Sequence, residues 1–114
     1  MHELSIAEGL IDEIMRIAVE NGLSRVDEVE IETGTLRQVV PEVMAEAFRA
    51  VSEGTPAERA LLRIYEKKAS AECKACGSAF EPQPNDITCT VCGATDTKIT
   101  GGDEIILKAV VGDR

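Results

Sequence analysis

The chain has few aromatic residues and only one histidine, His2, among its 114 residues. Aromatic residues make up 3% of the sequence, and tryptophan is absent. A core must therefore be built from aliphatic side chains, which the hydrophobic share of 44% can supply. The sequence has no second histidine to act as a general base, no phosphate-binding glycine loop and no nucleophilic serine elbow. These absences argue against an enzyme.

Basic residues and long hydrophobic runs are also scarce. Twelve Lys and Arg face 21 Asp and Glu, for a net charge of −9. We expect no nucleic-acid binding, because phosphate contacts need clustered Lys and Arg. No stretch approaches the roughly 18 apolar residues that span a bilayer, and the acidic beginning of the chain lacks the basic residues of a signal peptide. We therefore expect a cytoplasmic protein without a membrane partner, whose cysteines are thiols or metal ligands.

Two helices are predicted in the first half of the chain. Ser5 and Glu8 form a capping-box pattern, and the helical apolar spacing that follows stops at Gly22. This pattern predicts a helix capped by Ser5 and leaves residues 1–4 as a free extension. Pro41 suits the first turn of a second helix, where its missing N–H costs nothing. The predicted apolar side of that helix consists of Val40, Met44, Ala47, Phe48 and Val51.

Three segments have the composition of β-strands. After its first step, the segment of residues 26–33 alternates between apolar and acidic positions, and residues 62–67 alternate Leu, Ile and Glu with Arg, Tyr and Lys. Residues 103–111 form an apolar run that is too hydrophobic to stand alone, so we expect it to return and pair with the earlier strands. The predicted fold is α+β, with two helices on a three-stranded sheet and an inserted four-cysteine module that resembles a zinc ribbon.

Four cysteines carry the most specific chemical signal. Cys73-Lys-Ala-Cys76-Gly and Cys89-Thr-Val-Cys92-Gly are two knuckles in which both sulfurs of a tight turn can face one cation. Twelve residues separate the pairs, enough for a short hairpin that brings the knuckles together. Four thiolates in a tetrahedral array are typical of a structural zinc site. An iron site of the rubredoxin type and a redox-active cysteine pair are the alternatives, but the first usually lies among aromatic residues and the second opens a helix after a strand.

The change in composition around the cysteines predicts two domains. Residues 1–69 form an α+β domain that the returning strand, residues 103–114, completes. Residues 70–102, which are rich in Cys, Gly, Pro, Asn and Thr, form a zinc-binding domain.

The amino terminus can form a different kind of metal site. The amine of Met1 and the backbone and near ring nitrogens of His2 can occupy three corners of a square plane, a geometry that Ni(II) and Cu(II) prefer. A fourth donor could come from the backbone or carboxylate of Glu3, from water or from elsewhere. Because His2 is bulky, we expect aminopeptidases to leave Met1 in place. On the residues alone, a solvated histidine is the alternative interpretation.

The sequence as a whole resembles the HypA/HybF family of nickel chaperones for [NiFe]-hydrogenase maturation. The motifs that carry this resemblance run from the first residues to the last strand: Met1-His2-Glu3-Leu4-Ser5, Gly34, Val40-Pro41-Glu42, Ala47-Phe48, Gly54-Thr55, the two cysteine knuckles and Gly102-Asp103-Glu104-Ile105-Ile106.

The resemblance implies a nickel-binding domain and a zinc domain. Its metal ligands would be Met1, His2 and Glu3 for nickel and Cys73, Cys76, Cys89 and Cys92 for zinc. It further implies delivery of nickel with a HypB-type GTPase to the hydrogenase large subunit, and in some bacteria work with urease maturation proteins. A zinc-ribbon adaptor that binds another protein without nickel transfer is the alternative function.

Two departures from the family pattern are visible. Some relatives have a histidine in the zinc module that can join the nickel site, and this module has none. Relatives also commonly show Glu-Gly-Ala where this chain has Glu58-Arg59-Ala60. We interpret the second departure as a local difference in a turn.

Overall fold

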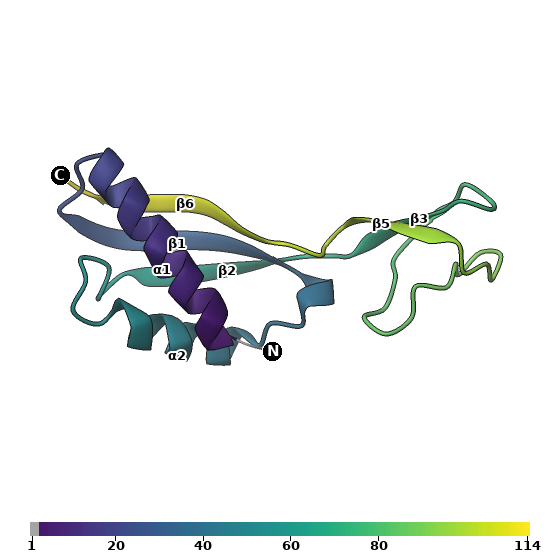
Figure 1. Ribbon diagram of the computed structural model, residues 1–114, viewed down its shortest axis with the longest axis horizontal. Helices are drawn as coiled ribbons and strands as arrows, with labels where there is room; N and C mark the ends of the chain where they lie inside the picture. The colour runs from purple at the N-terminus through teal and green to yellow at the C-terminus, as the bar shows by residue number, and fades with distance from the viewer. Residues whose placement is uncertain (1–2) are drawn as a thin grey trace. The chain divides into compact units, whose positions relative to one another are not determined.

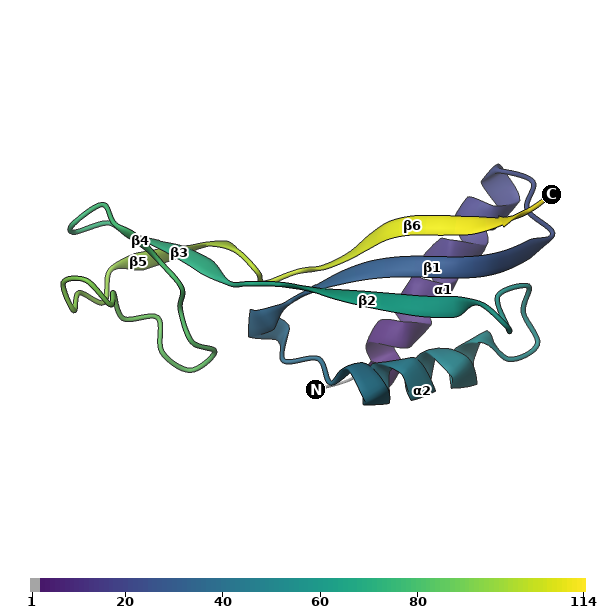
Figure 2. The same cartoon turned by 180° about the vertical axis from the view of Figure 1, so that it is seen from behind.

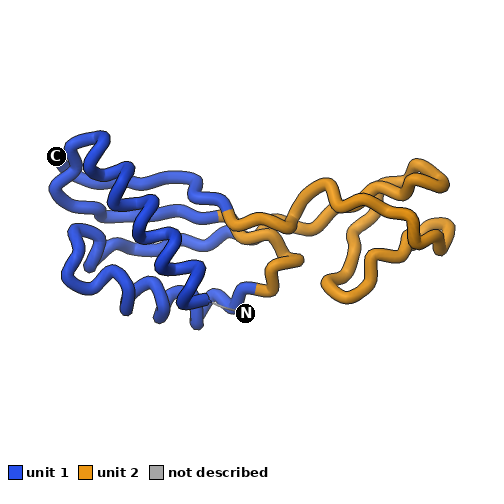
Figure 3. The backbone as a smooth tube through the Cα atoms, viewed as in Figure 1, with its two compact units in different colours: residues 1–31, 39–65, 106–114 blue, residues 32–38, 66–105 orange. Residues whose placement is uncertain are grey.

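The computed structural model describes residues 3–114. The elements follow one another as α1 (Glu3–Glu20), β1 (Arg25–Gly34), the 3-10 helix η1 (Thr35–Arg37), α2 (Pro41–Ser52), β2 (Leu61–Lys67), β3 (Ser70–Cys73), β4 (Ala79–Phe80), β5 (Thr97–Gly101) and β6 (Ile105–Asp113) (Figure 1). The chain divides into two compact units, drawn in two colours in Figure 3. Unit 1 comprises Met1–Ile31, Val39–Tyr65 and Ile106–Arg114, and unit 2 comprises Glu32–Gln38 and Glu66–Ile105. Across the described residues, no helix is both long and apolar enough to span a membrane.

The first sheet has the strand order β2-β1-β6. The last strand therefore returns to pair with β1, and the predicted three-stranded sheet is confirmed. Helix α1 lies across one face of this sheet, as the views from the front and from behind show (Figures 1 and 2), and it packs against α2. The buried core between these elements is almost wholly aliphatic and consists of Ala7, Leu10, Ile11, Ile14, Ala18, Val26, Val29, Ile31, Met44, Phe48 and Ala57.

The predicted start of the first helix is wrong. Leu4 and Ser5 lie inside α1, so Ser5 is not its N-cap, and the described part of the predicted free extension is helical. The side chain of Glu3, at the start of α1, has a partner outside the helix. A carboxylate oxygen of Glu3 accepts the backbone N–H of Val40 at 3.2 Å, and Glu3 is only 6% exposed. Met1 and His2, the rest of the predicted extension, lie outside the described residues.

The other helix boundaries follow the sequence signals. Gly22 adopts a left-handed conformation with φ +67°, which ends α1. Pro41 is the first residue of α2, as predicted. Met44 and Phe48 are buried on the inner side of α2. Val40 departs from the predicted apolar side, because it precedes the helix and is 46% exposed.

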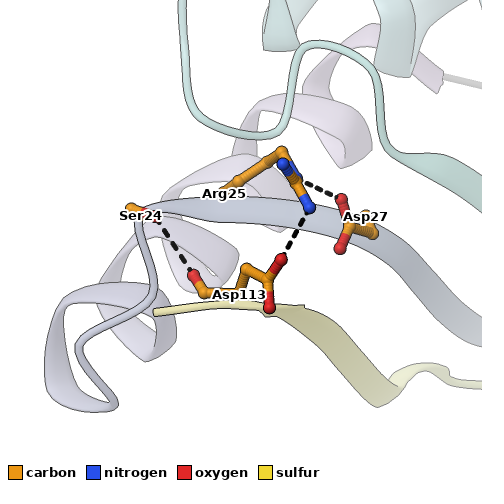
Figure 4. Close-up of polar contacts among 4 residues, drawn as sticks. All are labelled: Ser24, Arg25, Asp27 and Asp113. Atoms are coloured by element: carbon orange, nitrogen blue, oxygen red, sulfur yellow. Dashed lines mark hydrogen bonds and ion pairs between the residues drawn. The ribbon is translucent and has the colours of Figure 1, made fainter.

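Polar contacts fasten the end of β6 to the start of β1 (Figure 4). The backbone N–H of Ser24 donates to the carbonyl of Asp113 at 2.7 Å, and the guanidinium of Arg25 bridges the carboxylates of Asp113 at 2.7 Å and Asp27 at 2.6 Å. The hydrogen bond to Asp27, together with both negative charges, raises the pKa of Arg25. Such exposed ion pairs contribute little stability. These ion pairs follow from the pairing of β6 with β1 rather than drive it.

Unit 2 contains a second three-stranded sheet, in the order β4-β3-β5, which the sequence patterns did not indicate. β3 pairs antiparallel with both neighbours: Ala71 lies opposite Phe80 on β4 and opposite Ile99 on β5. The core of this sheet is very small. Its buried residues are Ala71, Cys73, Phe80 and Cys89, with Ala94 and Ile99 packed against them.

Three stretches of backbone meet closely at the base of unit 2. A Cβ added to Gly34 would lie 2.1 Å from the carbonyl carbon of Gly102, and one added to Gly102 would lie 2.4 Å from the Cα of Ala69. Hydrogen bonds hold this crossing together. The N–H of Leu36 donates to the carbonyl of Gly102 at 3.0 Å, and the N–H of Ala69 donates to the Thr35 hydroxyl at 2.9 Å.

We predict that Gly102→Ala disrupts this crossing and that Gly54→Ala is the matched control. Both glycines have φ +78°, so both substitutions carry the left-handed cost of about 1 kcal/mol. Only Gly102 is also crowded, whereas nothing lies within 4 Å of a Cβ at Gly54. We therefore expect Gly102→Ala to lower the free energy of unfolding by about 2 kcal/mol more than Gly54→Ala does. Amide hydrogen exchange should show lost protection at Leu36 and Ala69 in Gly102→Ala alone. Equal protection in the two variants would contradict the steric argument.

Candidate metal centres

The two cysteine knuckles are built in the same way. In the first, the N–H of Gly77 donates to the carbonyl of Cys73 at 2.9 Å; in the second, the N–H of Gly93 donates to the carbonyl of Cys89 at 3.0 Å. Gly77 and Gly93 have φ values of +76° and +78°, which only glycine adopts easily. Each turn therefore depends on the glycine that follows its second cysteine. The tight turns also aim backbone N–H groups at sulfur, since the N–H of Cys76 lies 3.4 Å from the Sγ of Cys73.

The second knuckle directs two N–H groups at one sulfur. Those of Val91 and Cys92 lie 3.3 Å and 3.4 Å from the Sγ of Cys89. Hydrogen bonds to a sulfur favour its thiolate form, which is the form that binds metals. The spacing of the cysteines predicted the turns, but the contribution of the Val91 amide had no signal in the sequence.

The four sulfurs are spaced as the ligands of one metal ion. All four Sγ atoms lie within 4.8 Å of one another. The Sγ atoms of Cys73 and Cys92 are 3.6 Å apart, and those of Cys76 and Cys89 are 3.8 Å apart. A tetrahedral zinc with bonds of about 2.3 Å separates its sulfurs by about 3.8 Å, whereas a disulfide joins them at about 2.0 Å. The four cysteines therefore form a metal site.

Burial and pKa differ among the four thiols. Cys73 and Cys89 are buried, while Cys76 and Cys92 are exposed. Hydrogen bonds from the side chain and backbone of Ser78 lower the pKa of Cys76 to about 6. The backbone N–H of Ala94 acts to lower the pKa of Cys92, but the sulfurs of Cys73 and Cys76 outweigh it and raise this pKa to about 12. One exposed ligand is thus ready as a thiolate at neutral pH, and the other must lose a proton to bind.

The predicted nickel ligands fall at the other end of the chain. Met1 and His2 lie outside the described residues. Glu3, the third predicted ligand, begins α1 with its carboxylate buried against the backbone of Val40. Within residues 3–114, the cysteine quartet is the one cluster of potential metal ligands.

The contact between Glu3 and Val40 escaped the sequence analysis. The two residues are 37 positions apart in the sequence, and each lies in a motif that was interpreted without reference to the other. Pro41 is the nearest signal: a helix that begins with proline and has no capping side chain at Val40 leaves its first turn without a local cap.

The fold and the cysteine cluster define a small α+β protein with an inserted four-thiolate metal module. A family model described as "Hydrogenase/urease nickel incorporation, metallochaperone, hypA" matches residues 1–111. The chain belongs to this family, the HypA nickel metallochaperones of hydrogenase maturation. The resemblance drawn from the sequence is confirmed. The family consists of metallochaperones rather than enzymes, which agrees with the expectation that this chain is not an enzyme.

Relatives match over nearly their whole length. The hydrogenase maturation factor HypA of Chlorobium phaeobacteroides is 36% identical over 110 residues, which cover 96% of this chain and 97% of that one. HypA of Aquifex aeolicus is 34% identical over 110 residues, 96% of each chain. The solution structure of the nickel metallochaperone HypA from Helicobacter pylori superposes with a TM-score of 0.73 at 27% identity, over 99% of this chain and 98% of that one.

We predict that removing the metal from the cysteine quartet unfolds the second sheet but leaves the first intact. The core of unit 2 is too small to fold by itself, whereas unit 1 has a large aliphatic core. After treatment with a chelator, the amides of Ala71 and Ile99 should lose protection from hydrogen exchange while those of Ile14 and Ile31 keep it. Persistent pairing of Ala71 with Ile99 in metal-free protein would contradict this expectation.

Proposed function

We propose that this chain is a nickel metallochaperone that binds Ni(II) at its amino terminus and, with a partner GTPase, delivers it to the large subunit of [NiFe]-hydrogenase. The observation that carries the proposal is the family match, which begins at residue 1 and so includes the Met1-His2-Glu3 segment. The family acts in nickel incorporation for both hydrogenase and urease. Urease maturation proteins are accordingly proposed as further partners.

The proposed nickel ligands are the amine of Met1, the backbone and ring nitrogens of His2, and Glu3. Nitrogen donors on consecutive residues suit the square-planar preference of Ni(II). The site is built at the end of the chain, where an acceptor can reach the metal and exchange the ligands one after another. Such a site must hold nickel only moderately, because delivery requires release.

We propose that the cysteine quartet holds zinc and that zinc has a structural role. The donor set supports this assignment: four thiolates close the coordination shell and leave no position for a substrate. The sulfur separations of 3.6 and 3.8 Å fit a tetrahedral zinc. Bound zinc would supply the stability that the small core of unit 2 lacks. We further propose the division into a nickel domain, residues 1–69 with 103–114, and a zinc domain, residues 70–102.

We propose that the protein works in the cytoplasm, together with its proposed partners, a GTPase and an immature metalloenzyme. Selection of nickel must then come partly from these partners, because Cu(II) binds nitrogen ligands more tightly than Ni(II). The net charge of −9 suits basic rather than acidic partner surfaces.

We predict that zinc-loaded protein binds one Ni(II) and that His2→Ala abolishes this binding. A variant with extra residues before Met1 should lose it too, because the extension converts the amine into an amide. Affinity should fall as the pH drops below about 7, since an amine with a pKa of about 7.7–8.0 and an imidazole with a pKa of about 6.5 must both lose protons to bind. Calorimetric titration measures all three effects. If both variants bind nickel as tightly as the unaltered chain, the amino-terminal site is wrong.

Metal analysis of the purified protein tests the second site separately. We expect one zinc per chain, retained in His2→Ala. Iron at the cysteine quartet would contradict the zinc assignment without affecting the nickel proposal.

A further inference from the structure

The strand β2 forms one edge of the first sheet. The strand order β2-β1-β6 leaves one side of β2 without a neighbouring strand among the described residues. Such an edge presents a row of backbone N–H and C=O groups that can pair with another strand. Leu61 and Tyr65 on this strand are 54% and 50% exposed. The fold therefore leaves a place beside β2 at which a further strand can be added.

A cavity lies between β2 and α2, the helix that is drawn beside this strand in Figure 2. Its volume is about 280 Å³, just below the range of about 300–1,000 Å³ that is typical of small-molecule sites. Phe48 of α2 and Leu61 and Leu62 of β2 belong to its apolar wall. Because side chains alternate across a strand, every second side chain of a strand added to β2 would point to the side of the sheet on which α2 lies. The cavity is thus placed to receive such a side chain.

Two arginines also line this cavity. Arg49 lies on α2 and Arg59 precedes β2, and both line an adjoining cavity together with Glu53 and Glu58. Within residues 3–114, neither guanidinium forms an ion pair, although the carboxylates line the same space. A guanidinium offers a planar fork of donors that matches a carboxylate. Arg59 is also the residue at which this chain departs from the Glu-Gly-Ala of its relatives.

We propose that β2 and α2 together bind an extended acidic segment of a partner protein by strand addition. The segment pairs its backbone with the free edge of β2, places an apolar side chain in the cavity, and directs a carboxylate to Arg49 and Arg59. This surface belongs to unit 1 and requires no metal. The inference goes beyond the proposed function, because nickel transfer assigns no role to the edge of β2.

The charges of this surface favour an acidic segment over other occupants. A free phosphate would meet two carboxylates as well as the two arginines, and it would gain nothing from the strand edge. A second copy that paired β2 with β2 would bring like charges together, because Arg59, Arg63 and Lys67 recur along residues 59–67. Most of the surface repels an acidic segment, since the chain carries a net charge of −9, and the arginines attract it at one place.

Titration of the full chain with synthetic peptides tests the surface. The probe is acetyl-Val-Glu-Val-Glu-Val-amide, and acetyl-Val-Lys-Val-Lys-Val-amide is its control of opposite charge. We expect the acidic peptide to bind at β2 and the basic peptide not to bind there. Arg49→Ala and Arg59→Ala should each weaken binding about fivefold, as expected for loss of one exposed ion pair. Arg16→Ala, which removes an exposed arginine of α1, should leave binding unchanged.

Amide hydrogen exchange locates the bound peptide. Strand addition should slow exchange at alternate residues of the stretch 61–65, whose N–H groups point to the free edge, and should leave the other edge strand, β6, unchanged. An acidic peptide that is methylated at every backbone nitrogen keeps its charges but has no donors. We expect this peptide not to bind.

The outcomes distinguish the occupants. Equal binding of the methylated peptide would overturn strand addition, and so would displacement of the acidic peptide by inorganic phosphate at constant ionic strength. Self-association of the chain that is lost in Arg59→Ala would make a second copy the occupant and would also overturn the proposal. Unchanged affinity in both arginine variants would remove the assigned role of these residues. His2→Ala should bind the peptide normally, so failure of the nickel proposal leaves this one intact.

Discussion

The close crossing of Gly34, Ala69 and Gly102 is the constraint on which the rest of the chain depends. The chain leaves the first sheet after β2 and must return beside β1 as β6, so both ends of the inserted segment are joined to β1 at one place. Hydrogen bonds from Leu36 and Ala69 secure that place without any large side chain. Because only backbone atoms meet at the crossing, β1, β2 and β6 can pair whatever segment connects β2 to β6. A separate metal module can therefore be inserted there.

The sequence predicted the elements whose cause is local. The alternation of β1, proline at the start of α2 and the Cys-x-x-Cys-Gly turns each act within a few residues, and all are present. The contact of Glu3 at the start of α1 could not be predicted in this way, because its partner is 37 residues distant. The second sheet was missed for a related reason. Its strands are two to five residues long and too short to show a period, and they surround a core half of which is cysteine.

The two proposed metal sites have opposite physical designs. At the cysteine quartet, two ligands are buried, backbone N–H groups point at the sulfurs, and loss of the metal exposes a core that cannot persist. Release is therefore linked to unfolding, which suits a metal that stays. The amino-terminal chelate uses mostly backbone nitrogens, so its chemistry comes from the position of His2 rather than from a cluster of side chains. Release from this proposed chelate would require protonation of its amine and imidazole, which suits a metal that moves on.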